Sequence, residues 1–127
     1  MSKATILLID DEIQMLTLLA DILDVRGYSV ITADNGTDGY NLAISKRPDL
    51  IILDLAMPDI DGGQVAQQLR ETSQTEHIPI IFLTGLLSKD IETNNKHIVG
   101  GNIMFAKPCD FGDLTNQIET LLAAPAT

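Results

Sequence analysis

The segment DLIILD (residues 49–54) decides the fold, because it places four consecutive apolar residues between two aspartates. A strand with no polar residue between its ends offers no face to solvent, so other elements must cover both of its faces. The segments 4–9, 79–84 and 103–106 are similar apolar runs, and 28–33 is rich in residues that favour strands. The sequence therefore predicts a parallel sheet of five strands with helices on both sides.

Longer segments with apolar residues at helical spacing separate these strands. They cover residues 12–26, 35–46, 62–71, 88–99 and 111–123. The segment 88–99 has the weakest helical pattern, since Asn94 and Asn95 lie in its middle. Gly27 is expected to end the first helix and Asn35 to cap the second. The alternation predicts an α/β fold of type (βα)₅, a flavodoxin-like three-layer sandwich with the parallel strands in the order 2-1-3-4-5.

Composition limits the function. The chain has 127 residues, with 8 Lys and Arg against 18 Asp and Glu, which gives a formal charge of −10. This acidic excess argues against direct binding of nucleic acid. The single cysteine, Cys109, excludes an internal disulfide, and no targeting or membrane-spanning segment is visible. We expect a cytoplasmic protein with one domain over residues 1–123 and a tail or linker start at 124–127.

Polar side chains follow the predicted strands at the edge where ligands bind in such sheets. Asp10 and Asp11 follow the first strand, Asp54 ends the third, Thr84 ends the fourth, and Lys107 follows the fifth. Each group alone has an ordinary explanation, as a solvated helix start, a strand end or a surface turn. Their joint placement indicates a site.

The chemistry of this site follows from its charges. Two carboxylates about 4 Å apart repel by about 4 kcal/mol at an effective dielectric constant of about 20, so the site must either raise a pKa or bind a cation. Carboxylate oxygens suit a hard cation such as Mg²⁺. A carboxylate beside Mg²⁺, a hydroxyl and a lysine is an arrangement that favours phosphoryl transfer to the carboxylate.

Four motifs in order resemble the receiver domain of two-component response regulators. They are ILLIDDE (residues 6–12), LIILDLAMPDIDGG (50–63), IPIIFLTG (78–85) and FAKP (105–108). Each motif is weak alone, but together they extend the resemblance over essentially the whole chain. The resemblance implies a phosphorylation-controlled signalling switch rather than an enzyme.

The resemblance also implies a role for each site residue. Asp54 takes the phosphoryl group, and Thr84 and Lys107 then contact that group. Mg²⁺ is held by Asp10, Asp11 and Asp54 together with the backbone carbonyl of Ala56.

The expected phosphodonor is a sensor histidine kinase or a histidine phosphotransfer protein. The signal is expected to leave through the face formed by residues 79–84, 88–99, 103–106 and 111–123, toward an unknown output protein or domain. The expected state is a monomer or weak dimer, with no direct contact to nucleic acid or membrane.

The sequence departs from the family pattern around this site. Met104 stands where the family usually has Tyr or Phe as a switch residue, and Phe105 should point to the opposite face of its strand. Gly85 replaces the usual Ala. We therefore expect signalling to depend mainly on Thr84 and residues 88–99. Ala56 and Leu86 cannot position an attacking water by hydrogen bonding, which predicts slow self-dephosphorylation.

Two other functions fit the same fold class. A flavodoxin-like flavin-binding protein needs a Ser-, Thr- or Gly-rich phosphate loop after the first strand, whereas this chain has two aspartates there. A Mg²⁺-dependent phosphatase with an aspartate nucleophile usually has a second Asp two residues after the first, where this chain has Ala56. Both remain alternatives at this point.

Overall fold

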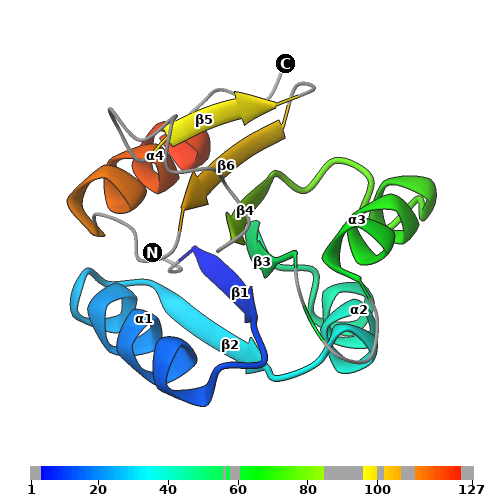
Figure 1. Ribbon diagram of the computed structural model, residues 1–127, viewed down its shortest axis with the longest axis horizontal. Coiled ribbons are helices and arrows are strands. Elements are labelled where there is room, and N and C mark those ends of the chain that lie inside the picture. Colours follow the sequence, from blue (N-terminus) through cyan, green and yellow to red (C-terminus); the bar gives the residue numbers. More distant parts are fainter. Residues whose placement is uncertain are drawn as a thin grey trace.

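The computed structural model describes residues 4–55, 57, 61–84, 96–99, 102–106 and 111–123. Within these residues one six-stranded sheet lies between helices (Figure 1). The strands are β1 (Thr5–Ile9), β2 (Ser29–Ala33), β3 (Leu50–Asp54), β4 (Ile80–Thr84), β5 (Lys96–Val99) and β6 (Asn102–Ala106). The helices are α1 (Ile13–Val25), α2 (Gly36–Lys46), α3 (Gly62–Glu71) and α4 (Phe111–Ala123).

The strand order is β2-β1-β3-β4-β6-β5, and the first five strands in this order are parallel. Since β6 is the fifth predicted strand, the parallel sheet in the order 2-1-3-4-5 is confirmed. Two local predictions are also confirmed. The side chain of Asn35 caps α2 by accepting from the backbone N–H of Asp38 at 2.8 Å, and Gly27 follows the last turn of α1 with φ +96°.

The helix predicted over residues 88–99 is wrong for its last four residues. Lys96–Val99 form β5, which pairs antiparallel with β6, while residues 88–95 lie outside the described residues. The sequence does contain a signal for this hairpin. Ile98 and Val99 favour strands, and two glycines separate Val99 from its register partner Asn102. A four-residue segment is too short to show a helical or strand period, so periodicity alone could not find β5.

Helices cover both faces of the sheet, as the apolar strands require. One hydrophobic cluster joins Ile6, Leu8 and Phe105 to residues of α1 and α4. The other joins Leu7 and Ile9 to residues of α2 and α3. Figure 1 shows the same three layers, with α1 and α4 on one side and α2 and α3 on the other. Among the described residues, no helix is both long enough and apolar enough to cross a lipid bilayer.

Candidate functional site

The register of the sheet brings the predicted site residues to one edge. Ile9 pairs with Leu53, so Asp10 and Asp54 occupy the next position of β1 and β3. Asp54 in turn pairs with Leu83, which places Thr84 one position further along β4. Thr84 pairs with Ala106, the residue before Lys107. The carboxyl ends of the parallel strands therefore meet where the sequence predicted a site.

Backbone hydrogen bonds fix the segment that carries Asp10 and Asp11. The N–H of Asp10 donates to the carbonyl of Ala33 at 3.1 Å, which ties the end of β1 to the end of β2. The Asp10 carboxylate accepts from the N–H of Glu12 at 2.9 Å, in the turn that leads into α1. Asp10 is 3% exposed, whereas Asp11 is exposed. The turn thus holds one carboxylate inside and its neighbour toward solvent.

The carboxylates of Asp10, Asp11 and Asp54 form one cluster. Each contributes an oxygen, and these oxygens all lie within 4.8 Å of one another. Asp54, at 3% exposed, is as buried as Asp10. Buried carboxylates this close need a compensating charge, and a donor set made only of carboxylate oxygens suits Mg²⁺. The exposed Asp11 leaves the cluster open to solvent on one side. The residues present therefore fit a Mg²⁺ ion.

A glycine lets α3 approach the end of β3. A Cβ atom at Gly62 would overlap the carbonyl oxygen of Asp54 and lie 2.7 Å from the Cα of Leu55. The N–H of Gly62 donates to the carbonyl of Leu55 at 2.9 Å, which fixes this close approach. Asp61 caps the helix by accepting from the N–H of Gly63 at 2.7 Å. This role of Gly62 was not predicted from the sequence. The Asp61-Gly62 pair was its only signal, because the collision depends on how α3 packs against β3.

The other predicted site residues are only partly described. Thr84 is placed by its backbone as the last residue of β4. Ala56, Gly85, Leu86 and Lys107 lie outside the described residues, and so do the predictions made for them.

The two neighbours on β6 take opposite faces, as predicted. Phe105 is fully buried in the cluster with α1 and α4, and Met104 packs against the cluster with α2 and α3. In the sheet, Met104 pairs with Phe82 on β4 and with His97 on β5. Met104 therefore lies on the same face of the sheet as α2 and α3.

Comparison with known proteins gives a consistent result. Residues 6–119 match the family model described as the response regulator receiver domain. Protein PilH of Pseudomonas aeruginosa is 34% identical over 122 residues, which cover 94% of this chain and 98% of PilH. The DNA-binding dual master transcriptional regulator RpaA of a Synechocystis species is 35% identical over 119 residues, which cover 92% of this chain but 48% of RpaA.

A solved structure agrees with these sequence matches. The chemotaxis protein CheY4 of Vibrio cholerae superposes with a TM-score of 0.80 at 28% identity, over 94% of this chain and 99% of that chain. The chain thus spans nearly all of PilH and CheY4 and about half the length of RpaA.

Proposed function

This chain belongs to the response regulator receiver domain family, a family of phosphorylation-controlled signalling switches, and from that premise we propose that Asp54 is its phosphoacceptor. The observation that carries the proposal is the carboxylate cluster at the carboxyl end of the sheet. Asp54 ends the central strand β3 there and lies beside Asp10 and Asp11. A buried carboxylate beside two others that could hold Mg²⁺ is suited to accept a phosphoryl group and hold it.

In the proposed reaction, a carboxylate oxygen of Asp54 attacks the phosphorus of a phosphohistidine. The new P–O bond forms as the P–N bond breaks, and the electron pair returns to the imidazole nitrogen, which takes up a proton. The product is an aspartyl phosphate, a mixed anhydride. The donor histidine would belong to a sensor histidine kinase or a histidine phosphotransfer protein.

Asp10, Asp11 and Asp54, together with the backbone carbonyl of Ala56, would hold Mg²⁺ at this site. When bound, the ion supplies positive charge beside the phosphoryl oxygens. The turn at Asp10, fixed by its bonds to Ala33 and Glu12, keeps that carboxylate in place before the reaction begins.

Thr84 and Lys107 would bind the phosphoryl group and so distinguish the phosphorylated state from the unphosphorylated one. The hydroxyl of Thr84 would donate a hydrogen bond to a phosphoryl oxygen, and the ammonium group of Lys107 would pair with another. The register supports both roles, since Thr84 lies one position beyond Leu83, the partner of Asp54, and Ala106 pairs with Thr84. Contacts made only in the phosphorylated state shift a two-state equilibrium toward the signalling form.

The surface next to these residues would carry the signal to an output protein or domain. It consists of β4, β6 and α4, with β5 added at the edge of the sheet. We further propose that the chain acts in the cytoplasm, as a monomer or weak dimer, without contacting nucleic acid directly. The formal charge of −10 supports the last point.

The test is phosphorylation by acetyl phosphate with Mg²⁺, read by intact mass. The wild-type chain should gain the mass of one phosphoryl group, and Asp54→Asn should gain none, because an amide is a far poorer nucleophile than a carboxylate. Asp49→Asn is the matched control. Asp49 precedes the same strand at its other end and accepts from the N–H of Thr5 at 2.7 Å, a bond that an asparagine oxygen can keep. Labelling of Asp54→Asn at the wild-type rate would move the acceptor to another residue.

A further inference from the structure

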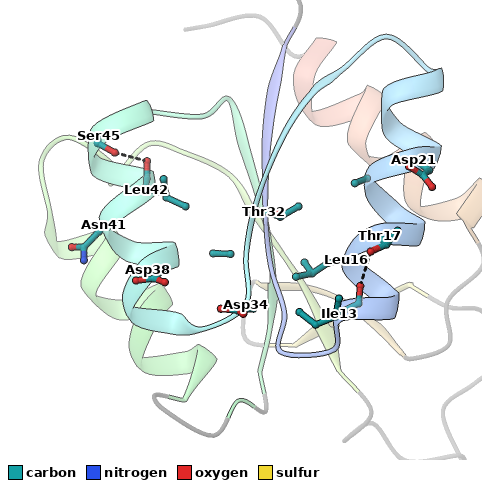
Figure 2. A pocket seen from close by; sticks show the side chains of 12 residues that line it. Ile13, Leu16, Thr17, Asp21, Thr32, Asp34, Asp38, Asn41, Leu42 and Ser45 are labelled. Atoms are coloured by element: carbon teal, nitrogen blue, oxygen red, sulfur yellow. Dashed lines mark hydrogen bonds between the residues drawn. The ribbon is translucent and has the colours of Figure 1, made fainter.

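An open groove runs along the outer edge of β2, which ends the sheet among the described residues, and none of the predicted site residues that the structure describes lines it (Figure 2). We call it the β2 groove. It has a volume of about 900 Å³, and its walls are α1 and α2, which cover opposite faces of the sheet. Thr32 and Ala33 of β2 lie between these walls, with Asp34 after them. Figure 2 shows side chains from both helices on either side of the strand.

The outer edge of β2 has no pairing partner among the described residues, and this edge continues into the groove at Thr32. The N–H of Ser29 donates to the carbonyl of Ala4 at 2.9 Å, and the carbonyl of Ala33 accepts from Asp10 at 3.1 Å. In an extended strand the N–H and C=O groups of alternate residues point to opposite sides. The backbone N–H and C=O groups of residues 29, 31 and 33 therefore point toward β1, and those of Val30 and Thr32 point toward the open edge. Such an edge is a template for one further strand.

The walls of the groove offer apolar contacts to the side chains of an added strand. On α1, Ile13 is 58% exposed and lies in the groove, near the buried Leu16 and the half-buried Ala20. On α2, the half-buried Leu42 lies opposite. Successive side chains of an added strand would point alternately toward α1 and α2. The groove therefore offers an apolar contact surface to the side chains on both faces of an added strand.

The polar groups of the groove are acidic. Asp21, Asp34 and Asp38 line it and are exposed, and its lining includes no lysine, arginine or histidine among the residues that the structure describes. Two of these acids are held together by one amide. Nδ2 of Asn35 donates to Asp34 at 2.8 Å and to Asp38 at 3.0 Å. These fixed carboxylates give the groove a negative potential that favours a cationic partner.

The hydroxyl groups of the groove add to this preference. Thr17 donates its hydrogen to the carbonyl of Ile13 at 3.0 Å, and Ser45 donates its hydrogen to that of Leu42 at 3.4 Å (Figure 2). Both hydroxyls therefore offer lone pairs rather than hydrogens to a ligand. A partner rich in donors, such as lysine or arginine side chains, complements this set.

We propose that the β2 groove binds an extended segment of a partner protein, which adds a strand to β2 and carries Lys or Arg among its side chains. Backbone hydrogen bonds to Val30 and Thr32 give the binding mode, and the three aspartates select a basic sequence. A second copy of this chain is disfavoured as the occupant, since pairing two β2 edges would bring together two acidic grooves on chains of formal charge −10. The proposal is independent of which residue accepts the phosphoryl group.

The probe is a synthetic peptide that alternates lysine and valine, with the matching glutamate–valine peptide as control. Amide exchange is followed by NMR on the ¹⁵N-labelled full chain. With the lysine peptide, the N–H groups of Val30 and Thr32 should exchange at about one tenth of their rate in the free chain, or more slowly still, because they become hydrogen-bonded. Ser29 and Ile31 already face β1 and should change little. The glutamate peptide should have no effect.

Two charge-matched triple variants separate the groove from general electrostatics. The first, Asp21→Asn with Asp34→Asn and Asp38→Asn, should raise the dissociation constant of the lysine peptide about tenfold, as expected for three exposed ion pairs. The control changes Glu71→Gln, Glu76→Gln and Glu119→Gln, which are also exposed but lie outside the groove, and should change it little. If the first variant is unstable, the amide exchange of Val30 and Thr32 in the wild-type chain still tests the proposed strand addition.

Three results would overturn the proposal. One is an equal loss of binding in both triple variants, which would mean attraction to the whole acidic surface. Another is binding of the lysine peptide with unchanged exchange at Val30 and Thr32, which would mean that no strand is added. The third is protection of these amides without peptide that grows with protein concentration, which would identify a second copy as the occupant.

Discussion

The strands β3 and β2 have the same length and lie in one sheet, but their surroundings differ. β3 lies between β1 and β4, and all five of its residues are buried. β2 lies at the edge, and its residues are exposed or half-buried except for Ala33. At the other end of the described sheet, β5 pairs antiparallel with β6. The sheet thus has a closed centre and two open sides.

This difference separates two tasks. The centre has to hold carboxylates close together, which needs rigid support on every side. Asp54 ends β3, and its neighbour Asp10 directly follows the adjacent strand β1. The edge strands do not have to hold these carboxylates together, and the backbone groups along their outer sides are available for other contacts. The centre is therefore suited to the chemistry and the edges to binding partners.

The largest expected effect compares two isoleucines in one row of the sheet. Leu7 pairs with Ile51 on β3 and with Ile31 on β2, and both isoleucines belong to the same hydrophobic cluster. Ile51→Ala should lower the free energy of unfolding by about 2–5 kcal/mol, because the cavity is enclosed. Ile31→Ala should cost about 2 kcal/mol or less, since the side chain is already part-exposed. Urea unfolding measures both, and equal losses would contradict the division between centre and edge.

A smaller effect is expected at the junction of β3 and α3. Gly62→Ala should lower the free energy of unfolding by about 1–3 kcal/mol, because the new methyl group meets the backbone of Asp54 and Leu55. It should also slow phosphorylation by acetyl phosphate, since Asp54 has to shift. Gly63→Ala is the matched control, where the methyl group would meet the Asp61 side chain at 3.2 Å. If Gly63→Ala is as harmful as Gly62→Ala, the close approach of α3 is not what positions Asp54.

The centre of the sheet and its site could be predicted from the sequence for a physical reason. A run such as LIIL at residues 50–53 can be satisfied only by burial on both faces, and that requirement implies the parallel sheet and its helices. Residues that follow such strands must then meet at one edge. The cluster of Asp10, Asp11 and Asp54 follows from strand order alone, without knowledge of side-chain packing.

The remaining features depend on contacts that no local pattern contains. The segment Lys96–Val99 is four residues long, so its pairing with β6 outweighs any propensity of its own. The role of Gly62 depends on the distance between α3 and β3. The β2 groove exists because two helices on opposite faces flank the same strand edge. These are tertiary features, and a single sequence carries only weak signs of them.

Amide exchange should distinguish the edge strand β5 from the centre. β5 is hydrogen-bonded to β6, whereas β3 is bonded to neighbours on both sides. The amides of β5 should open locally and exchange at least about tenfold faster than those of β3. The amides of β3 should open only with global unfolding. The measurement is native-state hydrogen exchange over a range of urea concentrations. Equal protection, with the same urea dependence, would mean that β5 belongs to the cooperative core.

The smallest expected effect concerns Tyr28, the residue before β2. Burial raises the pKa of the Tyr28 phenol above its ordinary value, the nearby carboxylate of Glu119 on α4 raises this pKa further, and Arg26 partly opposes both. Glu119→Gln should therefore lower the pKa of Tyr28 but leave it above the ordinary value, because burial is the larger cause. Absorbance of the phenolate against pH measures this in a Tyr40→Phe background, which removes the signal of the second of the two tyrosines. Glu71→Gln, on α3, is the control and should leave the curve unchanged.

The same shift has a consequence for stability at alkaline pH. Because the pKa of Tyr28 is raised in the folded state, that state holds the phenolic proton more tightly than the unfolded chain does. The contribution of Tyr28 to stability is therefore complete below the ordinary phenol pKa and is lost as the pH rises through the raised value. Tyr28→Phe should remove this part of the alkaline loss, whereas Tyr40→Phe should not. An unchanged alkaline loss in Tyr28→Phe would show that the start of β2 is as open to solvent as the rest of that edge, and that α4 does not shield it.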